Sequence, residues 1–187
     1  MIRIIAGSAR GRYIAAPPGQ GTRPTGSMAR EALFSILALR LPGARVLDLF
    51  AGSGAFGIEA LSRGAREACL VDNHRGCCRI IRENLQKTGL AENACVFCGT
   101  IPGILDQLKD RTFDLVFLDP PYRLGLAEIT CLALHRMVEQ GFPILLPGSL
   151  VVAETACGEE LTACSGFWRP MPVRRYGRSC FQFFNVV

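Results

Sequence analysis

Short apolar segments alternate with amphipathic segments through the middle of the chain, from residue 45 to residue 154. The apolar segments, which we predict as strands, are 45–50, 68–72, 94–98, 113–118 and 150–154. The segments between them, which we predict as helices, are 55–63, 75–88, 102–109 and 126–140. Strands that lack polar alternation are typical of parallel sheets, which helices cover on both faces. The pattern therefore predicts an α/β fold built on a parallel sheet.

The N-terminal end follows a different pattern. Residues 3–6 and 12–15 are predicted to form a β-hairpin, and a loop rich in proline and glycine follows it. A helix is expected from Ser27, which is a suitable N-cap residue, to about residue 41, where Pro42-Gly43 ends it. We therefore divide the chain into a basic N-terminal hairpin and loop, residues 1–26, and a main domain, residues 27–187.

The C-terminal end also departs from the strand–helix alternation. Residues 168–176 and 179–186 are predicted as two strands, and so short a connection allows only antiparallel pairing. The complete prediction is a doubly wound, mostly parallel sheet of seven strands that ends in an antiparallel C-terminal hairpin. A small N-terminal β-hairpin precedes the sheet.

The composition is that of a globular protein rather than a disordered one. Of the 187 residues, 49% are hydrophobic and 20% are charged. No apolar run reaches the roughly 18 residues that a membrane helix needs. The apolar start of the chain is interrupted by Arg10 and Arg12 too soon for a signal peptide. We therefore expect a cytoplasmic protein that does not bind membranes.

Nine cysteines are scattered through the apolar segments. Because their number is odd and no secretion signal precedes them, we expect them to be reduced and to serve as small hydrophobic residues. Cys95 and Cys98 have the C-x-x-C spacing, but residues three apart on a strand point to opposite faces. His74 and His135 have no second ligand nearby in the sequence. We therefore expect no metal site.

Charge is unevenly distributed along the chain. Residues 1–45 hold seven arginines and one acidic residue, and residues 161–187 hold four arginines and no acidic residue. The middle of the chain is acidic on balance. Arginine suits bidentate contacts with phosphate, so basic ends indicate a nucleic-acid partner. A solvated basic surface in an arginine-rich protein is the alternative interpretation.

The strongest local motif is a glycine-rich turn predicted between the first parallel strand and its helix. The segment from Asp48 contains G-x-G-x-x-G, formed by Gly52, Gly54 and Gly57. Glycines permit a sharp turn and a close approach of ligand to backbone. Asp72 ends the next predicted strand and is placed to accept hydrogen bonds from a ribose diol. A dinucleotide and S-adenosylmethionine both fit, because both carry an adenosine ribose.

A second motif, Asp119-Pro120-Pro121-Tyr122, follows the fourth predicted strand, at the sheet edge where ligands bind in such folds. The prolines stiffen the turn and leave carbonyl groups as acceptors. Asp119 and the Pro120 carbonyl suit the two N–H groups of an exocyclic amine, and Tyr122 suits stacking on the ring of its base. The motif favours S-adenosylmethionine over a dinucleotide, because a dinucleotide-dependent reductase would not account for the D-P-P-Y motif.

On these motifs the chain resembles the bacterial 16S rRNA (guanine-N2)-methyltransferases, a family of class I S-adenosylmethionine-dependent methyltransferases. The resemblance extends along essentially the whole chain. Many amino-methylating enzymes share the glycine turn and the D-P-P-Y motif. More particular to this family are Thr22-Arg23-Pro24-Thr25 and the segment Arg30-Glu31-Ala32-Leu33-Phe34.

The resemblance implies methylation of the exocyclic N2 amine of a guanine in 16S rRNA, free or within the 30S particle, by a monomer. The residues that it assigns to S-adenosylmethionine are Asp48, Phe50, Ala51, Gly52, Gly54, Gly57, Asp72, Asn73 and Thr100. The residues that it assigns to the target amine are Asp119, Pro120, Pro121 and Tyr122. The residues that it assigns to RNA contact are Arg10, Arg12 and Arg23.

Three positions depart from the family pattern. Ser27-Met28 stands where the family usually has Asp-Arg, and Asp72 stands where its ribose-binding acid is commonly Glu. Gly99-Thr100 replaces an Asp that usually faces the adenine amine, so Thr100 offers an acceptor without a charge. Two alternatives stay open: an amino-methyltransferase for another RNA or for DNA adenine, and a non-catalytic RNA-binding protein on the same fold.

Overall fold

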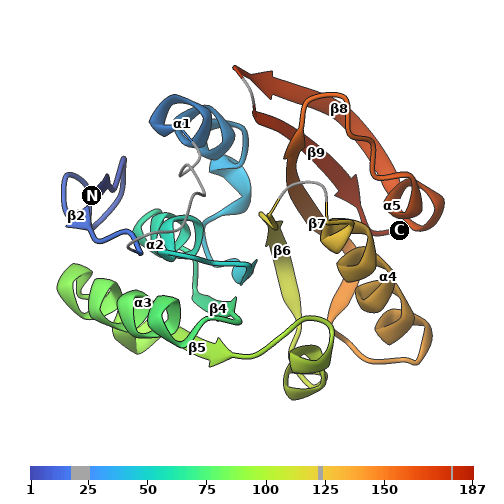
Figure 1. The fold of residues 1–187 in the computed structure, drawn as a ribbon, viewed down its shortest axis with the longest axis horizontal. Coiled ribbons are helices and arrows are strands. Elements are labelled where there is room, and N and C mark those ends of the chain that lie inside the picture. The colour runs from blue at the N-terminus through green and yellow to red at the C-terminus, as the bar shows by residue number, and fades with distance from the viewer. Residues whose placement is uncertain (18–25, 122–123, 178) are drawn as a thin grey trace. The chain divides into compact units, whose positions relative to one another are not determined.

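The computed structural model describes residues 1–17, 26–121, 124–177 and 179–187. The chain divides into two compact units, Met1–Gly99 and Thr100–Val187, whose elements are labelled in Figure 1. The domain boundary predicted at residue 26 lies within the first unit and stays a prediction.

The first unit is built on three parallel strands. They are β3 (Arg45–Leu49), β4 (Glu67–Asp72) and β5 (Ala94–Cys98), in the order β5-β4-β3. The register pairs Leu49 with Val71 and Asp72 with Cys98, so the carboxyl ends of the strands meet at one edge. Helix α2 (Ala55–Ser62) leads from β3 to β4, and α3 (Arg75–Thr88) leads from β4 through the short η2 (Ala91–Asn93) to β5. The sequence patterns at these elements predicted their bounds to within one or two residues.

The N-terminal hairpin consists of β1 (Ile2–Arg3) and β2 (Tyr13–Ile14), which pair antiparallel. Each strand has two residues, where the sequence pattern predicted four. Helix α1 (Ser27–Ile36) follows and passes into the 3-10 helix η1 (Ala38–Arg40), so the α-helix predicted to residue 41 is shorter. The prediction that Ser27 is its N-cap is wrong, because Gly26 takes that place and no side chain caps the helix.

The second unit is a four-stranded mixed sheet in the order β6-β7-β9-β8. Strand β6 (Phe113–Leu118) runs parallel to β7 (Leu145–Ala156), which pairs antiparallel with β9 (Ser179–Asn185). Strand β8 (Arg169–Tyr176) pairs antiparallel with β9 and completes the predicted C-terminal hairpin. The helical elements are η3 (Gly103–Leu108), α4 (Leu126–Glu139) and α5 (Thr162–Phe167). Helix α5 was not predicted, since six residues are too few to show a helical period.

Each unit has its own apolar core. In the first unit Leu47, Leu49 and Leu70 are fully buried in the strands. In the second unit the core is rich in phenylalanine from β6 and β9, including Phe113 and Phe181. Near-continuous burial along β3, β4 and β6 explains why these strands lack polar alternation. Within the described residues, no helix is long and apolar enough to cross a membrane.

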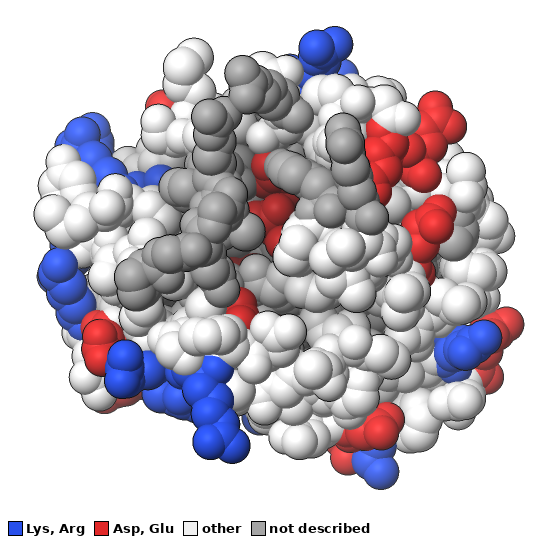
Figure 2. All heavy atoms as spheres, in the orientation of Figure 1, with Lys and Arg blue, Asp and Glu red and all other residues white. Residues whose placement is uncertain are grey.

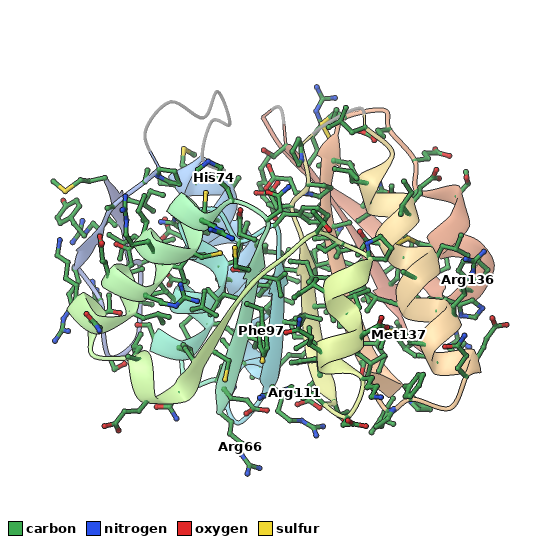
Figure 3. The ribbon with its side chains drawn as sticks, turned by 60° about the horizontal axis from the view of Figure 1, so that its bottom comes forward. Arg66, His74, Phe97, Arg111, Arg136 and Met137 are labelled. Carbon is green, nitrogen blue, oxygen red and sulfur yellow. A yellow bond between two sulfur atoms is a disulfide. The ribbon has the colours of Figure 1, made fainter. Side chains whose placement is uncertain are left out.

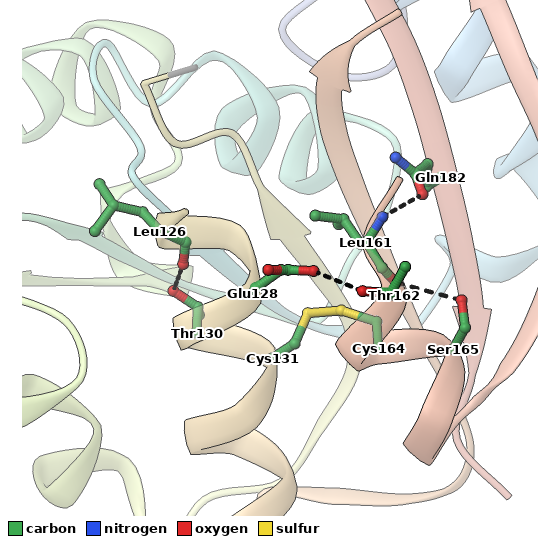
Figure 4. The surroundings of a disulfide bond; sticks show 9 residues. All are labelled: Leu126, Glu128, Thr130, Cys131, Leu161, Thr162, Cys164, Ser165 and Gln182. Atoms are coloured by element: carbon green, nitrogen blue, oxygen red, sulfur yellow. Dashed lines mark hydrogen bonds between the residues drawn. A yellow bond between two sulfur atoms is a disulfide. The ribbon is translucent and has the colours of Figure 1, made fainter. Parts of the chain in front are cut away.

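Two disulfides in the second unit contradict the expectation that all cysteines are reduced. Cys131 of α4 is bonded to Cys164 of α5 (Figure 4). Cys157 is bonded to Cys180 of β9. Their Cα–Cα distances of 5.8 and 5.2 Å lie in the usual disulfide range. The partners are 33 and 23 residues apart, so only the packing of α4, α5 and β9 brings them together. Cys95 and Cys98 are not part of a disulfide.

Candidate functional site

The glycine turn after β3 is a backbone structure that depends on left-handed residues. Phe50, Gly52 and Gly54 have φ values of 65°, 55° and 78°. Such values suit glycine but disfavour a bulky residue such as Phe50, and strained residues of this kind cluster at functional sites. The Ala51 N–H donates to the Val71 carbonyl at 2.9 Å, which ties the turn to β4. A side chain at Gly52 would meet open space, so this part of the turn is accessible to a ligand.

Gly57 has a different reason for being glycine. A Cβ there would lie 2.7 Å from Leu70 Cδ2 and 3.2 Å from Asp48 Oδ2. The missing side chain therefore allows α2 to pack closely on the sheet. The Gly57 N–H also donates to Asp48 Oδ2 at 2.8 Å. Contact between Gly57 and a cofactor stays a prediction.

Asp48 is a buried carboxylate with one unused oxygen. Its side chain is 0% exposed, and Oδ1 has no hydrogen-bond partner among the described residues. Burial raises the pKa of Asp48 to about 7, against the hydrogen bond from Gly57, and the negative charge of Asp72 raises it further. A buried acceptor without a partner is costly and calls for an explanation. A cationic or N–H-bearing ligand group provides one.

Asp72 is held against the glycine turn at the carboxyl end of β4. Its Oδ2 accepts from the Gly52 N–H and its Oδ1 accepts from the His74 N–H, each at 2.8 Å. Each carboxylate oxygen can accept a second hydrogen bond, so Asp72 keeps the capacity to accept two hydroxyl groups. The predicted contact of Asp72 with a ribose diol stays a prediction.

His74 lies at the same edge of the strands, whereas Arg66 lies at the opposite edge (Figure 3). The Nδ1 of His74 accepts from the Gly76 N–H at 3.1 Å and caps α3, and the backbone N–H of His74 donates to Asp72 and orients it. Asn73 beside it is exposed. Sequence reasoning considered His74 only as a metal ligand. Its position before a helix and two residues after Asp72 was the signal for a capping role.

Two free thiols, those of Cys78 and Cys98, lie near the carboxyl ends of β4 and β5. Cys78 is buried and its Sγ approaches the Asp72 carbonyl at 3.4 Å, while Cys98 is exposed at the end of β5. Burial raises the pKa of Cys78 to about 12, and a hydrogen bond with Cys98 adds to this. The Cys78 thiol therefore stays protonated near neutral pH. Within the described residues, no group of three or more His, Cys, Asp or Glu side chains is arranged to hold a metal ion.

The second motif lies where the sequence predicted it, directly after β6. Asp119 is half-buried, Pro120 is buried and Pro121 is exposed. Thr100 begins the second unit, is exposed, and its carbonyl accepts from the Ile104 N–H at 2.9 Å. Tyr122 lies outside the described residues. The roles of these side chains in binding the cofactor and the amine stay predictions.

The basic N-terminal hairpin presents arginine to solvent. Arg10 and Arg12 are both exposed, and basic side chains line the side of the first unit where β2 and α3 lie (Figure 2). Arg12 also donates to the Lys87 carbonyl in the last turn of α3 at 3.2 Å. A cation there interacts favourably with the helix dipole, so Arg12 has a structural role as well. Arg23 lies outside the described residues.

Comparison with known proteins shows the family to which the chain belongs. A family model described as Conserved hypothetical protein 95 matches residues 2–185. The chain belongs to this family. The chain is 45% identical, over 69% of its length, to Ribosomal RNA small subunit methyltransferase D of Escherichia coli, and the match spans 64% of that relative. It is 36% identical to the putative rRNA methyltransferase YlbH of Bacillus subtilis, over 82% of each chain.

The fold of this family member is also that of a solved structure. The putative methyltransferase yhhF from Escherichia coli superposes with a TM-score of 0.82 at 35% identity, over 99% of this chain and 97% of that one. The predicted fold class is confirmed: a mostly parallel α/β sheet fold of seven strands with an antiparallel C-terminal hairpin and a small N-terminal hairpin.

Proposed function

We propose that this chain is an S-adenosylmethionine-dependent methyltransferase that modifies the exocyclic N2 amine of a guanine in 16S rRNA. The observation that carries the proposal is the pair of carboxylates around the glycine turn. Asp48 has a buried oxygen that finds no partner in the described part of the chain, and Asp72 is fixed by two backbone N–H groups with acceptor capacity left over. The relatives named as rRNA methyltransferases supply the class of substrate.

The residues of the first unit fit S-adenosylmethionine group by group. Asp48 Oδ1 suits the ammonium of the methionine part, because a buried carboxylate is stabilised by an opposite charge. Asp72 suits the two ribose hydroxyls. The turn from Phe50 to Gly54 presents backbone against which the ligand lies, and the open space at Gly52 leaves room for it. We also assign Asn73 to the cofactor and, from the start of the second unit, Thr100.

We assign the binding of the substrate amine to the D-P-P-Y motif. Asp119 and the Pro120 carbonyl accept the two N–H groups of the target amine and so orient its nitrogen, while Pro121 keeps the turn rigid. Tyr122 stacks on the guanine ring, a contact that contributes about 1–3 kcal/mol in comparable cases. When bound, S-adenosylmethionine supplies a methyl group made electrophilic by the neighbouring sulfonium. The guanine must leave its base stack to reach the motif.

The task of the protein is mainly one of positioning. The amine of guanine is a weak nucleophile because its lone pair is delocalised into the ring, so holding it in line with the reacting bond supplies much of the rate enhancement. Asp119 need not be a strong base, since it can receive the proton after the new bond has formed. Arg10, Arg12 and Arg23 contact RNA phosphates. We place this reaction in the cytoplasm, with a monomer acting on 16S rRNA or on the 30S particle.

A transfer assay with methyl-labelled S-adenosylmethionine tests the proposal. The substrates are unmodified 16S rRNA transcribed in vitro, 30S particles reconstituted from that rRNA, and duplex DNA of mixed sequence. We expect label in one or both RNA substrates and none in DNA. Label in DNA alone would assign the chain to the DNA adenine alternative. Absence of transfer to every substrate, with RNA still bound, would favour the non-catalytic alternative.

A further inference from the structure

The N-terminal hairpin is attached to the first unit through buried polar side chains of α2. The Glu59 carboxylate is 0% exposed and accepts from the backbone N–H groups of Ile5 and Ala6 at 2.8 and 3.0 Å. Ser62 Oγ accepts from the Ala9 N–H at 3.0 Å. Because these acceptors are buried and paired, the hairpin is fixed on α2 rather than held by surface contacts.

Asn84 of α3 makes a second attachment of a different kind. The side chain is 2% exposed, and its Oδ1 accepts from the Ala15 N–H at 2.8 Å. Its Nδ2 donates to the Ala15 carbonyl and to the Ser53 carbonyl, each at 2.9 Å. Ala15 directly follows β2 of the hairpin, and Ser53 lies between Gly52 and Gly54 in the glycine turn. One buried amide therefore joins the basic hairpin to the turn that we assign to the cofactor.

The chemistry of the site requires asparagine. Both N–H groups of the amide are used, one for each carbonyl, and the oxygen satisfies the Ala15 N–H. Aspartate offers no donor for either carbonyl when ionised, and leucine, of similar size, offers neither donor nor acceptor. Replacing Asn84 with either residue leaves buried backbone groups without partners.

The turn also connects Ser53 to the two carboxylates of the proposed site. Its neighbour Gly52 donates to Asp72, and Gly54 is the N-cap of α2, which carries the Gly57 N–H that donates to Asp48. Asn84 therefore links the backbone at Ala15, directly after the hairpin, to the residue that separates these two glycines.

We propose that Asn84 is a positioning residue that couples RNA binding at the N-terminal hairpin to cofactor binding at the glycine turn. The proposal rests on the proposed function, because it assumes RNA at the hairpin and S-adenosylmethionine at the turn. Binding of RNA fixes the hairpin, Asn84 fixes Ser53, and the turn then binds the cofactor more tightly. Coupling between two binding sites is reciprocal, so the cofactor strengthens RNA binding by the same factor.

The test measures four dissociation constants for each variant. S-adenosylhomocysteine serves as the cofactor probe because it has no methyl group to transfer, and its affinity is measured with and without saturating unmodified 16S rRNA. The affinity for the RNA is measured with and without saturating S-adenosylhomocysteine. For the wild-type chain we expect both ratios to agree and to be about fivefold or more, at the lower end of typical coupling.

The variants are Asn84→Asp, which loses both donors, and Asn84→Ala, which loses the whole amide. We expect the coupling ratio of each to fall below about twofold, since each removes the connection to Ser53. Asn93→Asp is the matched control: Asn93 makes an exposed hydrogen bond of 3.2 Å to the carbonyl of Arg66, and Arg66 lies at the strand edge opposite His74 (Figure 3). This variant should keep the wild-type ratio.

Three outcomes overturn the coupling, and they differ in what they say about function. If the wild-type chain methylates rRNA but its two affinities are independent, the coupling is wrong and the proposed function stands. If the Asn84 variants melt at lower temperature yet keep the wild-type ratio, Asn84 serves stability alone. If the wild-type chain binds neither 16S rRNA nor the 30S particle, both proposals fail. The first comparison needs no variant, so poor folding of Asn84→Asp or Asn84→Ala leaves the coupling open to refutation.

Discussion

Replacing Asp72 with alanine should weaken cofactor binding while leaving the chain folded. Asp72 is the acceptor of two backbone hydrogen bonds at 2.8 Å, from Gly52 and His74, and it is 9% exposed. In the proposed complex it accepts further hydrogen bonds from the ribose diol. The substitution therefore removes the direct contacts with the ribose and also releases the Gly52 N–H that holds the turn in place.

The magnitude follows from the kind of hydrogen bond that is lost. A hydrogen bond to a charged group contributes about 1.5–3 kcal/mol, and the freed turn adds to the loss, while water in the open space near Gly52 offsets part of it. We expect a net loss of about 1–3 kcal/mol in the binding free energy, which corresponds to a rise of about 5- to 150-fold in Kd.

Isothermal titration calorimetry with S-adenosylmethionine measures this change, and circular dichroism establishes that the variant is folded. The matched control is Glu92→Ala, an exposed acid in η2, which should bind the cofactor as the wild-type chain does. NAD should bind neither protein. A folded Asp72→Ala protein with wild-type affinity would refute the role of Asp72, and binding of NAD without S-adenosylmethionine would refute the choice of cofactor.

Three further predictions concern the amine, the RNA and Asp48. Asp119→Ala should lower the rate of methyl transfer by about 10- to 150-fold, the equivalent of one charged hydrogen bond, with cofactor affinity unchanged by calorimetry; transfer at the wild-type rate would contradict it. Arg10→Glu should weaken rRNA binding and make the slope of log affinity against log salt shallower by about one unit or more, whereas a merely solvated arginine predicts an unchanged slope. The pKa of Asp48 is raised to about 7 in the folded chain, so between pH 4 and 7 the folded state holds a proton that the unfolded state has lost, and stability falls as the pH rises. Denaturant titrations of the ligand-free wild type and of Asp48→Asn should show that this fall is smaller in the variant, and identical pH profiles would count against it.

The sequence predicted most reliably what local periodicity determines. Strands β3 and β4 are buried on both faces, β5 is half-buried, and α2 and α3 end just before glycines 64 and 89. The strand ends placed Asp72 and Asp119 correctly, because the carboxyl end of a parallel strand is fixed once the strand is known. The hydrogen bond from the Gly52 N–H that orients Asp72 was not predicted, because spacing along the sequence does not show which backbone group meets a side chain.

Contacts between distant segments were beyond the reach of these patterns. Asn84 contacts a residue 69 positions away, and Glu59 contacts one 54 positions away, so neither spacing repeats a helical or strand period. Both side chains lie on buried helix faces, whereas glutamate and asparagine on a helix normally face solvent. The disulfides between Cys131 and Cys164 and between Cys157 and Cys180 depend in the same way on packing within the second unit. Gly26 replaced Ser27 as the N-cap because capping depends on backbone direction, which residue type alone does not fix.

The most direct test of the central claim is nucleoside mass spectrometry of unmodified 16S rRNA after incubation with the wild-type chain and S-adenosylmethionine. We expect one new modified nucleoside, N2-methylguanosine, at close to one per rRNA molecule, and its near absence with Asp119→Ala. A methylated adenosine, a guanosine methylated at a ring nitrogen, or no modification of rRNA in any assembly state would contradict methylation of a guanine N2 amine as the function of this chain.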